Sequence, residues 1–122
     1  MIILCEDNAD QRFALRLALE HAGYAVREAS DARKALALHR EKPAPVLITD
    51  LFMPEMDGFE LISAFKNEFP ETKIIVISAN RPESTMNYLA SADLMGVDAT
   101  LQKPFKVTAL LAILDGMTSA AR

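Results

Sequence analysis

The alternation of short apolar runs with longer stretches of helical periodicity is the feature that most constrains how this 122-residue chain can fold. Five such runs occur, at residues 2–5, 24–26, 46–49, 74–77 and 99–101. Their length and composition are typical of β-strands. The first, third and fourth runs lack an alternation of apolar and polar residues, which is typical of parallel strands covered by helices on both faces. The pattern therefore predicts a parallel sheet.

Helical periodicity occupies the stretches between these runs. In the first stretch, Asn8 and Gln11 have the spacing of a capping box, and Gly23 supplies the left-handed residue that commonly ends a helix. The other helices are predicted to begin at Asp31 and near Gly58, to run from just after Pro82 to Gly96, and to run from Lys106 to about Asp115. This repetition predicts a three-layer open α/β sandwich in one domain, residues 1–122, with residues 118–122 as a frayed tail.

Charge balance and cysteine content exclude several classes of protein. The 13 basic and 17 acidic residues give a net charge of −4 without a basic run, so direct nucleic-acid binding is not expected. Cys5 is the only cysteine, and its apolar setting indicates a core residue. His21 and His39 fall within predicted helices and are expected at the surface or its boundary. No apolar run approaches the roughly 20 residues that span a bilayer, so we expect no membrane association and a cytoplasmic location.

Polar residues follow the predicted strands at the points where open parallel sheets bind ligands, outside the carboxyl ends of the strands. The residues at these points are Glu6, Asp7, Asp50, Ser78 and Lys103. Three carboxylates that converge on one crevice repel one another, and a cation between them relieves the repulsion. Oxygen ligands without histidine or thiolate favour a hard ion, so the sequence predicts a Mg²⁺ site.

Asp50 is the candidate nucleophile of this predicted site. An aspartate beside a divalent cation, flanked by a hydroxyl and an ammonium group, is well placed to attack a phosphoryl group. The cation and Lys103 would neutralise charge on the phosphoryl oxygens, and Ser78 would donate a hydrogen bond to them. The strand ends therefore indicate phosphoryl transfer.

Four short motifs occur in order, each at the end of a predicted strand. They are Glu6-Asp7, Asp50-Leu51-Phe52-Met53-Pro54-Glu55-Met56-Asp57-Gly58, Ser78-Ala79 and Lys103-Pro104-Phe105. Together they resemble the receiver domains of two-component response regulators, and the resemblance covers essentially the whole chain. It implies a five-stranded parallel sheet in the order 2-1-3-4-5 with helices on both faces, the flavodoxin-like arrangement.

The resemblance also implies a role for each residue of the acidic crevice. Asp50 is the phosphoacceptor. Asp7, Asp50 and the backbone carbonyl of Phe52 bind Mg²⁺, and Glu6 acts largely through water. By this resemblance the chain assists its own phosphoryl transfer and its own dephosphorylation but has no separate substrate.

By the same resemblance, Ser78 and Lys103 bind the phosphoryl group, and the peptide bond between Lys103 and Pro104 is cis. One position departs from the commoner pattern. Thr100 stands three residues before the site lysine, where members of the family usually carry Tyr or Phe. Rotation of an aromatic side chain therefore does not serve as the readout, and we expect Ser78 and the loop after it to transmit phosphorylation.

The implied function is a phosphorylation-dependent signalling switch. A histidine kinase or a histidine phosphotransfer protein supplies the phosphoryl group, and the domain then changes its affinity for an output protein or domain. The fourth helix, the fifth strand and the fifth helix form the expected responsive face. The identity of the kinase and of the output stays open.

Three other functions compete with this interpretation. A nucleotide or flavin binder needs a phosphate-binding loop after the first strand, where Glu6 and Asp7 present negative charge instead. An aspartate-nucleophile phosphohydrolase usually has a second aspartate two residues after the first, where this chain has Phe52. A pseudo-receiver, which is an interaction module that takes no phosphoryl group, is the remaining alternative.

Overall fold

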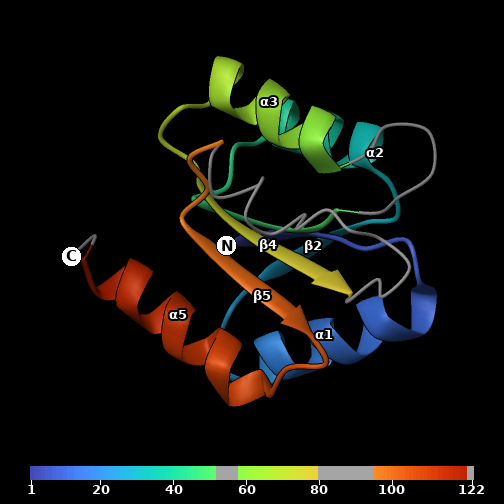
Figure 1. The fold of residues 1–122 in the computed structure, drawn as a ribbon, viewed down its shortest axis with the longest axis vertical. Coiled ribbons are helices and arrows are strands. Elements are labelled where there is room, and N and C mark those ends of the chain that lie inside the picture. The colour runs from blue at the N-terminus through green and yellow to red at the C-terminus, as the bar shows by residue number, and fades with distance from the viewer. Residues whose placement is uncertain (52–57, 80–94, 121–122) are drawn as a thin grey trace, which may run out of the picture.

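The computed structural model describes residues 1–51, 58–79 and 95–120. In these ranges the chain forms a five-stranded sheet in the order β2-β1-β3-β4-β5, and every neighbouring pair is parallel (Figure 1). The strands are β1 (Ile2–Cys5), β2 (Val26–Ala29), β3 (Val46–Asp50), β4 (Lys73–Ala79) and β5 (Ala99–Lys103). The predicted strand order is confirmed.

Helices cover both faces of this sheet. Those in the described ranges are α1 (Ala9–His21), α2 (Ala32–Glu41), α3 (Gly58–Glu68) and α5 (Val107–Ala120). In Figure 1, α2 and α3 lie on one side of the strands, and α1 and α5 lie on the other. The predicted fourth helix falls almost entirely on residues 80–94, outside the described ranges. Within those ranges no helix is both long enough and apolar enough to cross a membrane.

Two apolar clusters join the helices to the sheet. On one face, Phe65 of α3 shares a cluster of buried residues with Leu47 of β3. On the other face, Leu19 of α1 and Leu110 of α5 share a cluster with Ile48 of β3. Leu47 and Ile48 are adjacent, and they serve opposite faces because successive side chains of a strand alternate. All residues of β1 and β3 are buried for this reason, which explains why their sequences show no alternation.

The start of α1 is defined by Asn8, whose side chain accepts a hydrogen bond from the backbone N–H of Gln11 at 2.9 Å. This is half of the predicted capping box. In place of the other half, the backbone N–H of Asn8 donates to the carboxylate of Glu6 at 3.3 Å. The helix ends at His21, and Gly23 follows in the left-handed conformation with φ 98°, as predicted. The first turn of α1 is thus joined to the residue that follows β1.

The predicted bounds of β2 and α5 differ most from the structure. β2 lies at Val26–Ala29 rather than at 24–26, because its pairing with β1 continues beyond the apolar run. Polar residues are tolerated there since β2 is an edge strand. α5 continues to Ala120 rather than ending near Asp115. Met117, one turn after Leu114, still packs against the apolar cluster of that face, so the helix continues past Asp115.

His39 of α2 was predicted at the surface or its boundary, but its side chain is fully buried. Its Nδ1 accepts a hydrogen bond from the backbone N–H of Ala44 at 3.2 Å, and its Nε2 lies 3.1 Å from the hydroxyl of Thr72. The rings of Phe65 and Phe69 pack against it at centroid distances of 4.6 and 4.3 Å. Burial lowers the pKa of His39, so the neutral ring, with its proton on Nε2, is part of the core.

Candidate functional site

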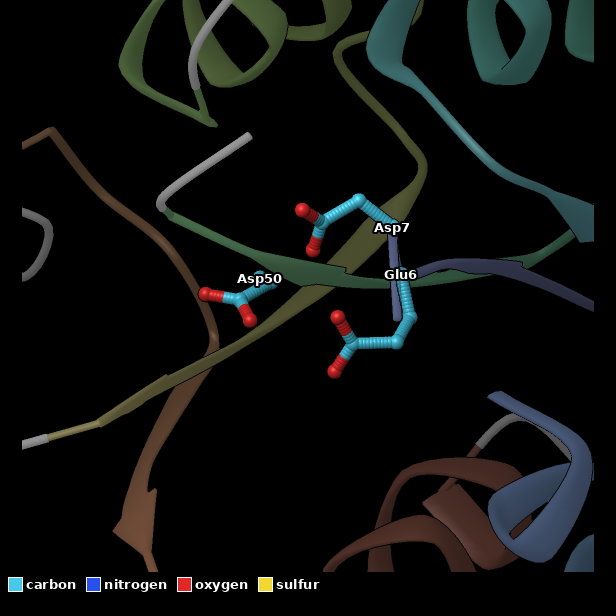
Figure 2. Close-up of side chains that lie close together, drawn as sticks. All are labelled: Glu6, Asp7 and Asp50. Atoms are coloured by element: carbon cyan, nitrogen blue, oxygen red, sulfur yellow. The ribbon is translucent and has the colours of Figure 1, made fainter. Parts of the chain in front are cut away.

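Three carboxylates lie at the carboxyl edge of the sheet (Figure 2). Glu6 directly follows β1, Asp7 comes next, and Asp50 is the last residue of β3. β1 and β3 are paired in register as far as Cys5 and Thr49, so the residues after them leave the sheet side by side. One oxygen from each of the three carboxylates lies within 4.8 Å of the others. The structure therefore brings together the acidic residues that the sequence placed at the strand ends.

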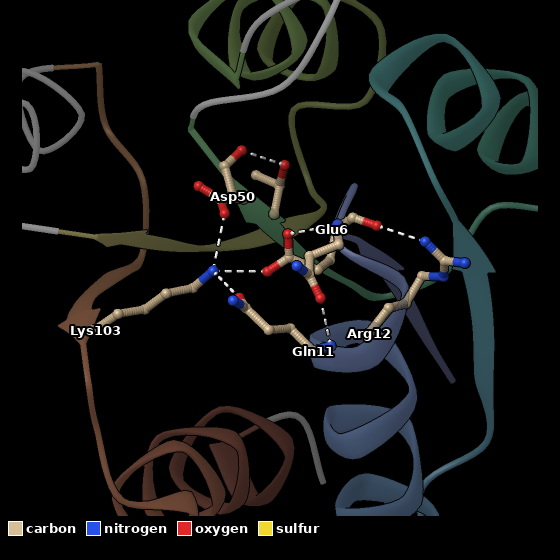
Figure 3. Close-up of polar contacts among 7 residues, drawn as sticks. Glu6, Gln11, Arg12, Asp50 and Lys103 are labelled. Carbon is tan, nitrogen blue, oxygen red and sulfur yellow. Dashed lines mark hydrogen bonds and ion pairs between the residues drawn. The ribbon is translucent and has the colours of Figure 1, made fainter.

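Lys103, the last residue of β5, places its ammonium group between two of these carboxylates (Figure 3). Its Nζ lies 2.7 Å from Oε1 of Glu6 and 2.9 Å from Oδ2 of Asp50. Glu6 is only 3% exposed and Asp50 8%, whereas Asp7 is exposed. The two buried carboxylates are thus paired with the lysine, and Asp7 opens the cluster to solvent. The bond between Lys103 and Pro104 is cis, as the resemblance implied.

Burial and charge act on these groups in opposing directions. Burial raises the pKa of the Glu6 carboxyl, and the negative charge of Asp50 raises it further, although the hydrogen bond from Lys103 lowers it. Burial alone would lower the pKa of Lys103, but its bonds to Glu6 and Asp50 outweigh burial and raise it. Lys103 is therefore cationic at neutral pH.

The donors at this edge fit Mg²⁺. All three candidate side-chain ligands are carboxylates, and hard divalent cations prefer oxygen donors. Among the described residues, three ionised carboxylates and one ammonium leave two negative charges, which one divalent cation would balance. The carbonyl of Phe52, the further ligand that the resemblance implied, lies outside the described ranges.

The backbone around Asp50 is held from two sides. The hydroxyl of Thr49 donates to the carbonyl of Asp50 at 2.9 Å, and the N–H of Gly58 donates to the carbonyl of Leu51 at 2.9 Å. A Cβ atom on Gly58 would lie 2.6 Å from Cα of Leu51 and 2.7 Å from the carbonyl oxygen of Asp50. The start of α3 therefore packs directly against the backbone of the candidate nucleophile, and only glycine allows this approach.

Ser78 lies on β4 at the same edge of the sheet. Asp50 pairs with Ile77, and Ser78 is the next residue of β4. Its partner on β5 is Gln102, the residue before Lys103. Ser78 is 1% exposed. The hydroxyl thus belongs to the strand that separates β3, which carries Asp50, from β5, which carries Lys103.

Comparison with known proteins agrees with this arrangement. The family model of the response regulator receiver domain matches residues 2–115, which is nearly the whole chain. The chain belongs to the receiver domain family. The response regulator receiver protein CpdR of Brucella abortus is 35% identical over 125 residues, covering 98% of both sequences.

Other relatives of this receiver domain are much longer, or resemble it chiefly in fold. The sensor histidine kinase TmoS of Ectopseudomonas mendocina is 38% identical over 120 residues, which cover 97% of this chain and 12% of TmoS. A solved receiver domain protein from Clostridium thermocellum has a TM-score of 0.89 at 21% identity, covering 98% of this chain and 94% of that one. The region similar to this chain is therefore nearly the whole of CpdR and a small part of TmoS.

Two contacts in the site of this receiver domain were not foreseen from the sequence. Oε1 of Gln11 lies 2.6 Å from Nζ of Lys103, and Nη1 of Arg12 donates to the carbonyl of Glu6 at 2.8 Å (Figure 3). The sequence pattern assigns Gln11 to a capping box instead. The available signal was position, because both residues lie in the first turn of a helix that begins directly after the acidic pair.

Proposed function

We propose that the chain is a phosphorylation switch in which Asp50 accepts a phosphoryl group from a phosphohistidine of a histidine kinase or phosphotransfer protein. The observation that carries this proposal is the contact between the carboxylate of Asp50 and the ammonium of Lys103 within an acidic crevice. A carboxylate poised between an ammonium group and a prospective cation site suits nucleophilic attack on an anionic group. Membership of the receiver family supports the same chemistry.

In the proposed reaction, an oxygen of Asp50 attacks phosphorus and the P–N bond to the imidazole of the donor breaks. The imidazole nitrogen leaves with the electron pair of that bond and takes up a proton. Lys103 balances charge on the phosphoryl oxygens, and Ser78 donates a hydrogen bond to them. Mg²⁺, held by Asp7 and Asp50 with Glu6 acting through water, would supply further charge neutralisation.

The single thiol of the chain is not a competing nucleophile. Cys5 is fully buried in β1, and burial raises the pKa of its thiol to about 12. A thiol in this state is protonated and inert at neutral pH. Asp50 therefore remains the nucleophile, and a buried reduced thiol suits the reducing cytoplasm that we propose as the location.

The proposed readout involves the segment after Ser78. Thr100 is half-buried on β5 and pairs with Val76, so no aromatic ring is present there to change position. We therefore expect Ser78 and the loop after it to move toward the phosphoryl oxygens. The fourth helix, β5 and α5 would then form the face that binds an output protein or domain. The loop after Ser78 and most of the predicted fourth helix fall on residues 80–94, which lie outside the described ranges.

Labelling with a small phosphodonor tests the proposal. Wild-type protein incubated with acetyl phosphate and Mg²⁺ should gain one phosphoryl group by intact mass, and Asp50→Asn should gain none. Asp10→Asn is the matched control, because Asp10 is an exposed aspartate of α1 outside the cluster, and it should label like wild type. Labelling that persists in Asp50→Asn would show that another residue accepts the phosphoryl group. A wild-type protein that takes no label would instead favour the pseudo-receiver.

A further inference from the structure

The first turn of α1 is attached to the candidate site through several hydrogen bonds. The Asn8 side chain caps the helix by accepting from the N–H of Gln11 at 2.9 Å, and the Asn8 N–H donates to Oε2 of Glu6 at 3.3 Å. Arg12, one residue further, donates to the carbonyl of Glu6 at 2.8 Å. The position of this turn is therefore defined relative to Glu6, and Gln11 lies between the two residues that make these contacts, Asn8 and Arg12.

The Gln11 side chain extends from this turn to the ammonium of Lys103, which is 92 residues later in the chain. A lysine ammonium has three N–H donors and no acceptor. In the described part of the chain, three acceptors surround Nζ of Lys103: Oε1 of Glu6 at 2.7 Å, Oδ2 of Asp50 at 2.9 Å and Oε1 of Gln11 at 2.6 Å. Each donor therefore has one partner, and Gln11 is the one neutral residue among the three.

We propose that Gln11 is a positioning residue that holds Lys103 for contact with the phosphoryl group of phosphorylated Asp50. The inference rests on the proposed function. Glu6 and Gln11 occupy two of the donors, so the third faces Asp50 and passes to a phosphoryl oxygen once Asp50 is modified. Without Gln11, the flexible lysine side chain loses one of its fixed points and samples other rotamers before it meets the phosphoryl group.

The neutrality of the amide is part of this role. A carboxylate at residue 11 would also accept from Lys103, but it would add negative charge beside Glu6, Asp7 and Asp50 and would repel an incoming phosphoryl group. An apolar side chain would add no charge but would leave one ammonium donor to water. Glutamine supplies an acceptor without a charge, and the two kinds of substitution therefore separate positioning from electrostatics.

The first test uses the protein without metal or phosphoryl analogue. In NMR spectra of the lysine ammonium groups, assigned with Lys103→Arg, Gln11→Met should shift or broaden the Lys103 signal and Gln11→Glu should preserve it. Gln102→Met is the matched control, because Gln102 is an exposed glutamine next to Lys103 whose side chain points to the opposite face of β5. A Lys103 signal that is identical in wild type, Gln11→Met and Gln102→Met would overturn the proposal.

The second test measures binding of beryllofluoride, an acyl-phosphate analogue, at constant Mg²⁺ by titration of amide chemical shifts. Because a hydrogen bond to a charged group is lost, Gln11→Met should bind about fivefold more weakly than wild type, and Gln102→Met should bind like wild type. Gln11→Glu should bind weakly even though it retains the Lys103 signal. Equal affinity in Gln11→Met and wild type would contradict the proposal. Failure of the wild type to bind the analogue would contradict the proposed function, and the ammonium spectra would still decide whether Gln11 holds Lys103.

Discussion

His39 is buried as a neutral ring whose Nδ1 accepts from the N–H of Ala44, and burial lowers its pKa. The unfolded chain therefore takes up a proton on this residue at a higher pH than the native protein does. Stability that is fully present above the unfolded-state pKa of about 6.5 should be lost as the pH falls below it. Because one proton is involved, the free energy of unfolding changes by at most about 1.4 kcal/mol per pH unit.

Urea unfolding of wild type and His39→Gln between pH 7.5 and 5.5 measures this slope. The variant should lose less stability than wild type over the same range. His21→Gln is the matched control, because His21 is exposed at the end of α1, and it should follow the wild-type curve. Burial of Glu6 acts in the opposite direction, since its raised pKa favours protonation of the native state, and it acts equally in all three proteins. Parallel curves for wild type and His39→Gln would refute the prediction.

The residues of the site differ in how far they could be predicted. The roles of Asp50 and Lys103 could be predicted because a parallel sheet places the carboxyl ends of its strands along one edge. The contact of Gln11 could not be predicted, because it depends on Lys103, a partner 92 residues away, whereas the local pattern indicates a capping box.

The burial of His39 in the core was not predicted either. Helical periodicity does not show that a polar ring can form hydrogen bonds with a backbone N–H and with the hydroxyl of Thr72.

Among the secondary-structure elements, the start of α3 most directly constrains the site. In Gly58→Ala, the new Cβ would lie 2.6 Å from Cα of Leu51 and 2.7 Å from the carbonyl oxygen of Asp50, so backbone must move. We expect the free energy of unfolding to fall by about 1–3 kcal/mol. Labelling of Asp50 by acetyl phosphate should also slow, because its carbonyl is one of the atoms displaced.

The same substitution in another helix provides the control. Gly116 lies within α5, and a Cβ there would meet no atom within 4 Å. Gly116→Ala should therefore raise the free energy of unfolding by about 0.5–1 kcal/mol through its higher helix propensity, and labelling should be unchanged. Chemical denaturation measures both variants. A Gly58→Ala protein as stable as wild type would show that α3 does not pack against Asp50 as described.

Element boundaries were less predictable than element order. The apolar run at 24–26 predicted β2 too early, since the strand is defined by pairing with β1 and not by its own hydrophobicity. The end of α5 was placed too early because Met117, one turn after Leu114, continues the face that packs against the apolar cluster. The layering was predicted despite both errors because it depends on β1 and β3, whose burial on both faces is visible in the sequence, whereas the strand order was implied by the resemblance.

For the molecule as a whole, Mg²⁺ should act as a stabilising ligand. The native fold brings the carboxylates of Glu6, Asp7 and Asp50 within 4.8 Å of one another, and the unfolded chain disperses them. A cation that binds only the native state stabilises it by about 2.7 kcal/mol at a hundredfold excess over Kd. The melting temperature should therefore rise with MgCl₂ at matched ionic strength. Asp7→Asn should weaken this response and Asp10→Asn should preserve it, whereas a wild-type melting temperature that does not respond would exclude the site.

Lys103 lies 97 residues after Glu6, and this separation has a consequence for synthesis. The three carboxylates are translated well before Lys103, which pairs with two of them. A nascent chain that ends after β4 lacks the edge strand β5, and its acidic site lacks the ammonium group of Lys103. For the proposed switch, we therefore expect the domain to accept a phosphoryl group only after β5 has been translated, so that incomplete chains do not compete with complete domains for the phosphodonor.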